Sequence, residues 1–303
     1  MTTSTSTSTA PPRTRGATRH RVERRVLGVL KWLTIAVTVL ACAGPLVYGI
    51  LLSLRPLTEV ITNPLDIFPA PSEMDFSSYT TALRPEAEGG GGMARFMGNS
   101  AIVALGTVVL ATACSVLGAY AAVRLRFLGR DTVSVLFLAV YLFPGIVLAV
   151  PLFVMFSRIG LRGQLVGLMI IYLAQTVPVA LFMLRNYFLA VPASVEEAAM
   201  TDGCTRTQVI WRVVLPMALP GIISTGLYVF MIAWNEYLYA LLFLVDKRDR
   251  WTASLGIAQL SDFAVPPTVL MAGSIALTVP IVVVFVLAQR SLLSGLTAGA
   301  EKG

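Results

Sequence analysis

The apolar positions of the chain fall into six long blocks that are separated by polar segments. Each block has the roughly 20 residues that an α-helix needs to cross about 30 Å of hydrocarbon. The pattern therefore predicts an all-α integral membrane protein with about six transmembrane helices. The expected spans are residues 30–53, 97–122, 133–156, 166–186, 218–245 and 268–289.

The composition supports a membrane location for the chain. Of its 303 residues, 56% are hydrophobic and only 13% are charged, and the mean hydropathy is +0.78. Soluble domains carry about 25% charged residues, so this chain has too little polar surface to cover a water-soluble globule. The net charge is +7, but the basic residues lie mainly in loops between apolar blocks, and no nucleic-acid partner is expected.

The N-terminal 26 residues differ in composition from the rest. Residues 1–12 are Ser/Thr repeats that end in two prolines, and a basic stretch follows from Arg13 to Arg25. We expect residues 1–26 to form a disordered, basic cytoplasmic tail, and residues 27–303 to form the transmembrane domain. The first apolar block is too long for the core of a signal peptide, so an uncleaved first helix is expected.

The loops between the blocks differ in positive charge. With the N-terminus inside, the inner segments hold 15 lysines and arginines and the outer segments hold 8. Cytoplasmic loops carry the excess of positive charge in membrane proteins. Both termini and the segment between the fourth and fifth spans are therefore expected in the cytoplasm.

Few residues offer chemistry of their own. The three cysteines and His20 do not have the spacing of metal ligands, so no metal site is expected. The run Gly89–Gly92 lacks the Gly-Lys-Ser/Thr that completes a phosphate-binding loop, so no nucleotide site is expected either. A membrane-embedded enzyme needs acids, histidines or metal ligands concentrated within its spans. The expected spans of this chain contain only one such acid, so an enzyme is a remote alternative. A structural membrane scaffold is another remote alternative.

The segment 192–221, between the fourth and fifth spans, predicts a hairpin of two short helices. Ser194 and Glu197 have the spacing of a capping box at the start of the first helix, and Thr205 and Gln208 have the same spacing at the second.

A glycine and a proline delimit these helices. Gly203 is expected to end the first helix in the left-handed conformation, and Pro216 to end the second or begin the next span. Ala198 and Ala199 would allow close approach of another surface. From the residues alone, a linker lying on lipid remains an alternative.

This hairpin resembles the EAA loop of ABC importer permeases. The family pattern is Glu-Ala-Ala, three residues, Gly, nine residues, Ile, one residue, Leu-Pro, and here valine replaces the isoleucine at 213. In the family this loop forms the coupling helix, which docks on a separate ATPase subunit. The resemblance implies coupling roles for Glu197, Ala198, Ala199, Gly203, Val213, Leu215 and Pro216.

Three further stretches resemble the maltose-type carbohydrate branch, and within it the shorter of the two paired permeases. They are Asn99-Ser100, Trp234–Tyr237 and the C-terminal 295–303, in which Glu301 departs from the usual valine. The resemblance implies a bacterial plasma-membrane importer in which this chain binds no cofactor. The implied partners are a second permease subunit, two ATPase subunits that bind ATP and Mg, an extracytoplasmic solute-binding protein, a sugar and membrane lipid. A same-family importer of glycerol phosphate, a polyamine or a peptide is the alternative.

Glu236 is the only acid inside an expected span. A charge at that depth is costly and normally faces a cavity or a partner, so Asn235 and Glu236 are candidates for the translocation pathway. The alternative is an acid near the interface that pairs with a basic residue or a loop amide. Gln175 in the fourth span is a weaker pathway candidate, because a single buried amide more often bonds a neighbouring helix.

Overall fold

The computed structural model describes residues 16–130, 132, 136, 139, 144–262 and 265–300. The described residues are almost all helical and contain no β-strand. The chain divides into two compact units, Met1–Leu51 and Leu52–Gly303. The described part of the first unit belongs to α1, Gly16–Ser53, whose last two residues fall in the second unit. Residues 16–26 are therefore helical where the sequence predicts disorder. Residues 1–15 lie outside the described residues.

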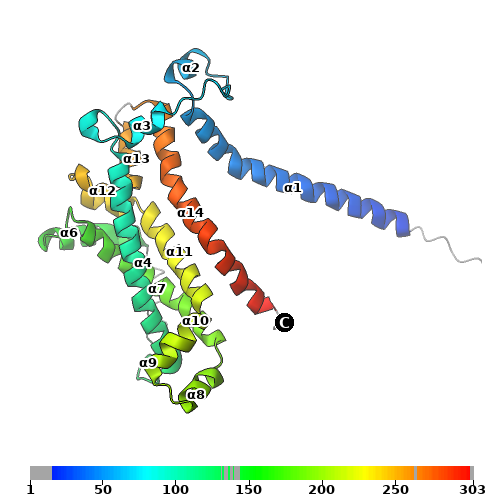
Figure 1. Cartoon of the computed structure of the whole chain (residues 1–303), viewed down its shortest axis with the longest axis vertical. Helices are drawn as coiled ribbons and strands as arrows, with labels where there is room; N and C mark the ends of the chain where they lie inside the picture. The colour runs from blue at the N-terminus through cyan, green and yellow to red at the C-terminus, as the bar shows by residue number, and fades with distance from the viewer. Residues whose placement is uncertain are drawn as a thin grey trace, which may run out of the picture. The chain divides into compact units, whose positions relative to one another are not determined.

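The second unit is built on four long helices. They are α4 (Met93–Arg124), α7 (Leu165–Ala190), α11 (Leu219–Asn235) and α14 (Pro267–Ala300). Helix α4 packs against α7 and α11, and α11 packs in turn against α7 and α14 (Figure 1).

Shorter helices lie at the two ends of this unit. One end carries α3 (Ser77–Leu83), α12 (Leu238–Leu244) and α13 (Ala253–Asp262), and the other carries α8 (Ala193–Thr201) and α9 (Arg206–Val209) (Figure 1). Helix α6 packs against α12. The remaining elements are α2 (Leu57–Thr62), η1 (Glu86–Glu88), α6 (Gly145–Arg158), η2 (Ile210–Val214), α10 (Leu215–Met217) and η3 (Arg248–Arg250).

The long helices correspond to the expected spans. Within the described residues, four helices are long and apolar enough to cross a membrane, and they are Glu23–Ser53, Met93–Arg124, Leu165–Ala190 and Pro267–Arg290. A fifth candidate is the pair Arg206–Met217 and Leu219–Asn235, which is bent by 75°. The expected third span, 133–156, lies partly outside the described residues, and its described second half belongs to α6.

The fifth span was expected to be one helix over 218–245, and this prediction is wrong. Helix α11 ends at Asn235, Glu236 has extended dihedral angles (φ −65°, ψ 130°), and α12 begins at Leu238. The carboxylate of Glu236 accepts hydrogen bonds from the backbone N–H groups of Tyr239 (2.8 Å) and Ala240 (3.2 Å). In a continuous helix these N–H groups would bond to the carbonyls of Asn235 and Glu236, so the Glu236 side chain replaces two helical bonds at the break.

Small residues bring the long helices close together. One face of α4 carries small side chains that are all fully buried, which are Ala104, Thr107, Ala111, Ser115 and Ala119. Where α4, α7 and α11 meet, a small buried cluster forms from Ala111, Ala180 and Val229. Small side chains let helix backbones approach, which is how membrane helices gain contact without a hydrophobic driving force between them.

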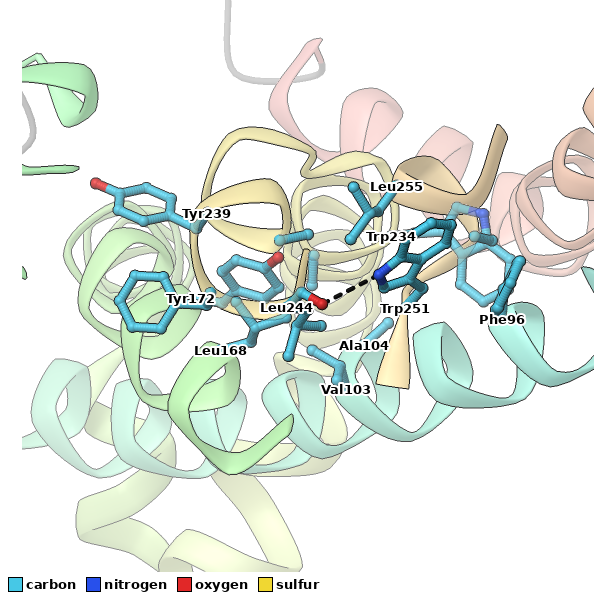
Figure 2. Close-up of a cluster of buried hydrophobic side chains, with 14 of the residues drawn as sticks. Phe96, Val103, Ala104, Leu168, Tyr172, Trp234, Tyr239, Leu244, Trp251 and Leu255 are labelled. Atoms are coloured by element: carbon cyan, nitrogen blue, oxygen red, sulfur yellow. Dashed lines mark hydrogen bonds between the residues drawn. The ribbon is translucent and has the colours of Figure 1, made fainter. Parts of the chain in front are cut away.

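The larger core cluster lies toward the end that carries α12 and α13 (Figure 2). Tyr172 and Trp251 are buried there, and the indole N–H of Trp251 donates to the carbonyl of Leu244 at 3.1 Å (Figure 2). The Asn99 amide donates to the carbonyls of Asp249 (3.0 Å) and Trp251 (2.9 Å). These bonds join the first turns of α4 to a segment about 150 residues later in the chain.

Candidate functional site

The hairpin between α7 and α11 consists of α8, α9, the π-helical turn η2 and α10. The expected capping box is present at α9, because the Gln208 N–H donates to the Thr205 hydroxyl while the Gln208 side chain accepts from the Thr205 N–H. Gly203 has φ +90°, which confirms the left-handed end of α8. No atom lies within 4 Å of a Cβ placed there, so the requirement for glycine is conformational rather than steric.

One local prediction for the hairpin is wrong. Helix α8 begins at Ala193 with Pro192 at its N-cap, and no side chain caps it, so Ser194 and Glu197 do not form a capping box. Proline lacks an N–H and its φ suits a helix start, so the helix begins before Ser194 can act as its cap. Pro216 lies in the first turn of α10, where proline is tolerated, and the chain bends after it at Ala218.

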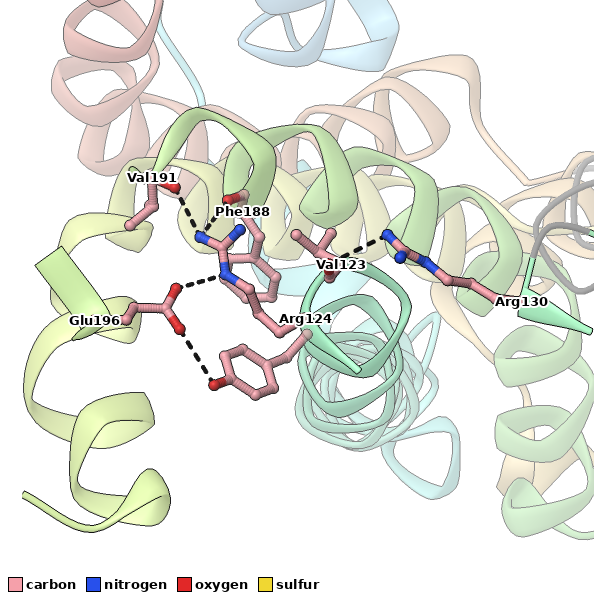
Figure 3. Close-up of polar contacts among 7 residues, drawn as sticks. Val123, Arg124, Arg130, Phe188, Val191 and Glu196 are labelled. Carbon is pink, nitrogen blue, oxygen red and sulfur yellow. Dashed lines mark hydrogen bonds and ion pairs between the residues drawn. The ribbon is translucent and has the colours of Figure 1, made fainter. Parts of the chain in front are cut away.

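A largely buried ion pair joins α8 to the long helices (Figure 3). Arg124, in the last turn of α4, donates from Nε to Oε1 of Glu196 at 2.6 Å. The same guanidinium donates to the carbonyls of Val191 (2.7 Å) and Phe188 (3.3 Å) at the end of α7. The Tyr120 hydroxyl donates to the other oxygen of Glu196 at 3.3 Å. No local sequence signal connects Arg124 with Glu196, since 72 positions separate them.

The expected coupling residues fall into two groups in the structure. Glu197, Ala198, Gly203 and Pro216 are exposed. The other three are partly buried against a cluster that includes Val209 and Val214, and they are Ala199, Val213 and Leu215. The hairpin therefore presents one face outward and packs the other against the ends of α4 and α7.

The structure brings two of the three pathway candidates together. The Tyr172 hydroxyl donates to Glu236 at 2.6 Å, and the Tyr239 hydroxyl donates to the carbonyl of Gly145 at 2.8 Å. The Gln175 amide nitrogen and the Tyr239 hydroxyl each lie 3.6 Å from a Cβ placed on Gly145, so Gln175 lies beside the polar cluster of Glu236. The backbone donors to the Glu236 carboxylate are the N–H groups of Tyr239 and Ala240, in the first turn of α12.

Asn235 lies apart from this polar cluster. It is exposed, and its amide donates to the Met231 carbonyl in its own helix. The sequence analysis missed the two tyrosines. Their spacing is a signal that could have found them, since Tyr172 precedes Gln175 by one helical turn and Tyr239 follows Glu236 by three positions.

The described residues contain no group of three or more His, Cys, Asp or Glu side chains that could hold a metal ion.

The bundle of long apolar helices and the bent hairpin between two of them define a membrane transport subunit. The chain belongs to the family of binding-protein-dependent transport system inner membrane components, whose model matches residues 115–296. The chain is therefore a permease subunit of an ABC transporter, and the family is not one of enzymes.

Individual relatives agree with this family. The chain is 42% identical to the inner membrane ABC transporter permease protein YcjP of Escherichia coli, over 68% of this chain and 73% of that protein. It is 32% identical to a trehalose/maltose transport system permease protein of Thermococcus litoralis, over 94% and 99% of the two chains.

A solved structure has the same fold. It is that of a bacterial ABC transporter involved in import of the acidic polysaccharide alginate, with a TM-score of 0.77 and 22% identity. The match covers 93% of this chain and 100% of that one. This likeness confirms the expected all-α membrane architecture.

Proposed function

We propose that this chain is one of two paired permeases in an ATP-driven importer of a carbohydrate, which an external solute-binding protein delivers. The family membership and the names of several relatives support the substrate class. Relatives that are 31–34% identical over at least 86% of this chain are named as permeases for trehalose, sulfoquinovosyl glycerol and diacetylchitobiose. A solved relative of the same fold was crystallised with a periplasmic protein bound to an alginate pentasaccharide.

The outward face of the hairpin is the proposed docking surface for an ATPase subunit. Glu197 and Ala198 lie exposed on α8, and Gly203 sets the bend that follows them. Ala199, Val213 and Leu215 support this face from beneath, and Pro216 leads into the span. Two ATPase subunits, one on each permease, would bind ATP and Mg, and this chain would bind no cofactor.

The break between α11 and α12 is the proposed border of the translocation pathway. Broken helices at membrane depth are tolerated where the backbone is buried in protein or lines a cavity. Asn235 is exposed at the break and would contact the solute, while Glu236 would hold the break in shape and Gln175 would lie beside it.

The orientation follows from the positive charge of the loops. We assign both termini and the hairpin to the cytoplasm and the end with α12 and α13 to the outside, in a bacterial plasma membrane. The excess of 15 over 8 lysines and arginines supports this assignment.

Uptake of labelled saccharides tests the substrate class. Cells lacking the gene should lose uptake of one mono-, di- or oligosaccharide, and a plasmid copy should restore it. An empty plasmid is the matched control. If a polyamine, a peptide or glycerol phosphate is the only solute whose uptake depends on the gene, the carbohydrate assignment is wrong while the permease assignment stands.

A further inference from the structure

The ion pair between Arg124 and Glu196 is largely shielded from water. Their side chains are 18% and 8% exposed. Removing two charges from water is costly unless each is paired and hydrogen-bonded. Here the guanidinium has three acceptors and the carboxylate has two donors, so both charges are satisfied.

The acceptors of Arg124 belong to different elements. The carbonyls of Phe188 and Val191 lie at the C-terminus of α7, where helical carbonyls lack partners and a positive charge is favourable. Glu196 lies in the first turn of α8, where a negative charge is favourable. One side chain on α4 therefore holds the end of α7 and the start of α8 at the same point.

Glu196 also fixes the rotation of α8. Successive residues of a helix point about 100° apart, so a buried Glu196 leaves the next two positions, Glu197 and Ala198, facing outward. Helix α8 otherwise packs mainly against α9 and η2 of its own hairpin. The ion pair is thus a direct polar connection from α8 to two membrane-spanning helices.

We propose that Arg124 is a positioning residue that makes α8 and the ends of α4 and α7 move as one body when the ATPase subunits close. The inference rests on the proposed docking of an ATPase at α8 and adds the route by which that movement enters the membrane. Without the guanidinium, α8 would still be bound by the ATPase but would move independently of the spans.

Spin labels on the assembled transporter test this route. One label replaces exposed Met200 on α8 and the other replaces exposed Leu189 near the end of α7, in a background without native cysteines. With Arg124 present, the distance distribution between the labels should be narrow and should not change on addition of ATP and vanadate. Arg124→Gln and Glu196→Gln should each lose the narrow distribution when nucleotide is trapped, and each should still hydrolyse ATP in a separate assay without vanadate.

Control variants separate positioning from stability. Arg126→Gln removes an exposed charge two residues away and should behave as the unsubstituted chain does. Arg124→Lys keeps the charge but cannot bond the same three acceptors at once, so it should give a distance distribution of intermediate width. If Arg124→Gln does not assemble, the Arg124→Lys variant tests the positioning role in its place. A narrow, unchanged distribution in every assembled Arg124 variant would overturn the proposal.

The unsubstituted transporter separates failure of this inference from failure of the proposed function. If ATPase subunits do not co-purify with the unsubstituted chain, the docking assignment itself is wrong. If they do, and the variants differ from it only in abundance, then Arg124 is purely structural and the positioning role is rejected.

Discussion

The carboxylate of Glu236 shows how one side chain can interrupt a membrane helix. It accepts hydrogen bonds from the Tyr172 hydroxyl and from the N–H groups of Tyr239 and Ala240, and the Ser254 hydroxyl donates to the carbonyl of the same residue. A charge at this depth is stable because protein donors replace water around it. Its neighbour Asn235 is exposed, and its side-chain amide donates to a carbonyl of its own helix.

Substitutions at the break should therefore separate stability from transport. Tyr172→Phe should lower the free energy of unfolding by about 1 kcal/mol, since it removes one hydrogen bond. Glu236→Ala should lower it by about 3 kcal/mol or more, because a hydroxyl and two N–H groups lose their acceptor. Denaturation in detergent, followed by tryptophan fluorescence, measures both effects.

Asn235→Ala is the matched variant on the other side of the break. We expect it to change the free energy of unfolding by less than about 0.5 kcal/mol, since the side chain is exposed, and to reduce sugar uptake. Loss of stability equal to that of Glu236→Ala, with normal uptake, would contradict the pathway role of Asn235.

Substitutions at Gly203 give a second prediction, in which backbone conformation alone determines the loss of stability. Because a Cβ at this position would contact nothing, the cost of a side chain comes from φ +90°. Gly203→Ala should cost about 1 kcal/mol and Gly203→Val more, whereas asparagine adopts the left-handed region more easily and should be tolerated best.

The spans should remain inserted in all three Gly203 variants, because their burial in lipid does not depend on the bend. Co-purification of ATPase subunits at equal permease abundance measures the effect, and it should fall in the order Gly, Asn, Ala, Val. Equal co-purification by all variants would show that the bend does not orient the docking face.

At the scale of elements, the hairpin has an outer face that is free to contact a partner and an inner face that packs against the permease. Ala198 is exposed on α8, while the adjacent Ala199 is partly buried against the cluster of Val209 and Val214. A substitution at one position acts on a partner, and the same substitution at the other acts on the hairpin itself.

Ala198→Asp and Ala199→Asp should therefore fail differently. Ala199→Asp buries a carboxylate without a partner at a cost of about 2 kcal/mol or more, and should make the hairpin sensitive to protease in the isolated permease. Ala198→Asp should leave protease resistance unchanged but abolish ATPase binding, and Ala198→Ser should preserve both. The same protease sensitivity in both aspartate variants would contradict the two-faced hairpin.

The elements that the sequence predicted well are those fixed by local signals. Helices α4, α7 and α14 cover the expected spans 97–122, 166–186 and 268–289, because a long apolar run in lipid has few alternatives to a helix. The bend at Gly203 and the capping box at Thr205 also depend on neighbouring residues alone.

What the sequence could not predict depends on distant partners. The break at Glu236 lies within one long, predominantly apolar block, and its cause includes Tyr172, 64 positions away. The pairing of Arg124 with Glu196 likewise requires the ends of α4 and α7 to be placed together. Ser194 was assigned as a cap because its spacing to Glu197 fits, although Pro192 starts the helix first.

At the scale of the whole molecule, the orientation is open to direct measurement. In right-side-out vesicles of a cysteine-free background, an impermeant maleimide should label a cysteine at Asp66 but not one at Arg206. Both residues are exposed, so accessibility does not bias the comparison. Opening the vesicles should expose position 206 to the reagent as well. Labelling of position 206 in sealed vesicles would reverse the assignment of the termini and the hairpin.

The bonds from Asn99 to Asp249 and Trp251 carry a consequence for synthesis of the chain. Until the ribosome has delivered residues 249–251, the Asn99 amide lacks one or both of these carbonyls. The ring of Phe96 likewise lacks the Trp251 ring, which lies 5.6 Å away in the finished fold. A chain cut short before that point would keep its early helices in the bilayer with an unsatisfied amide at the end of one of them. The unpaired amide would distinguish such a fragment from the finished permease and could make it a substrate for membrane proteases.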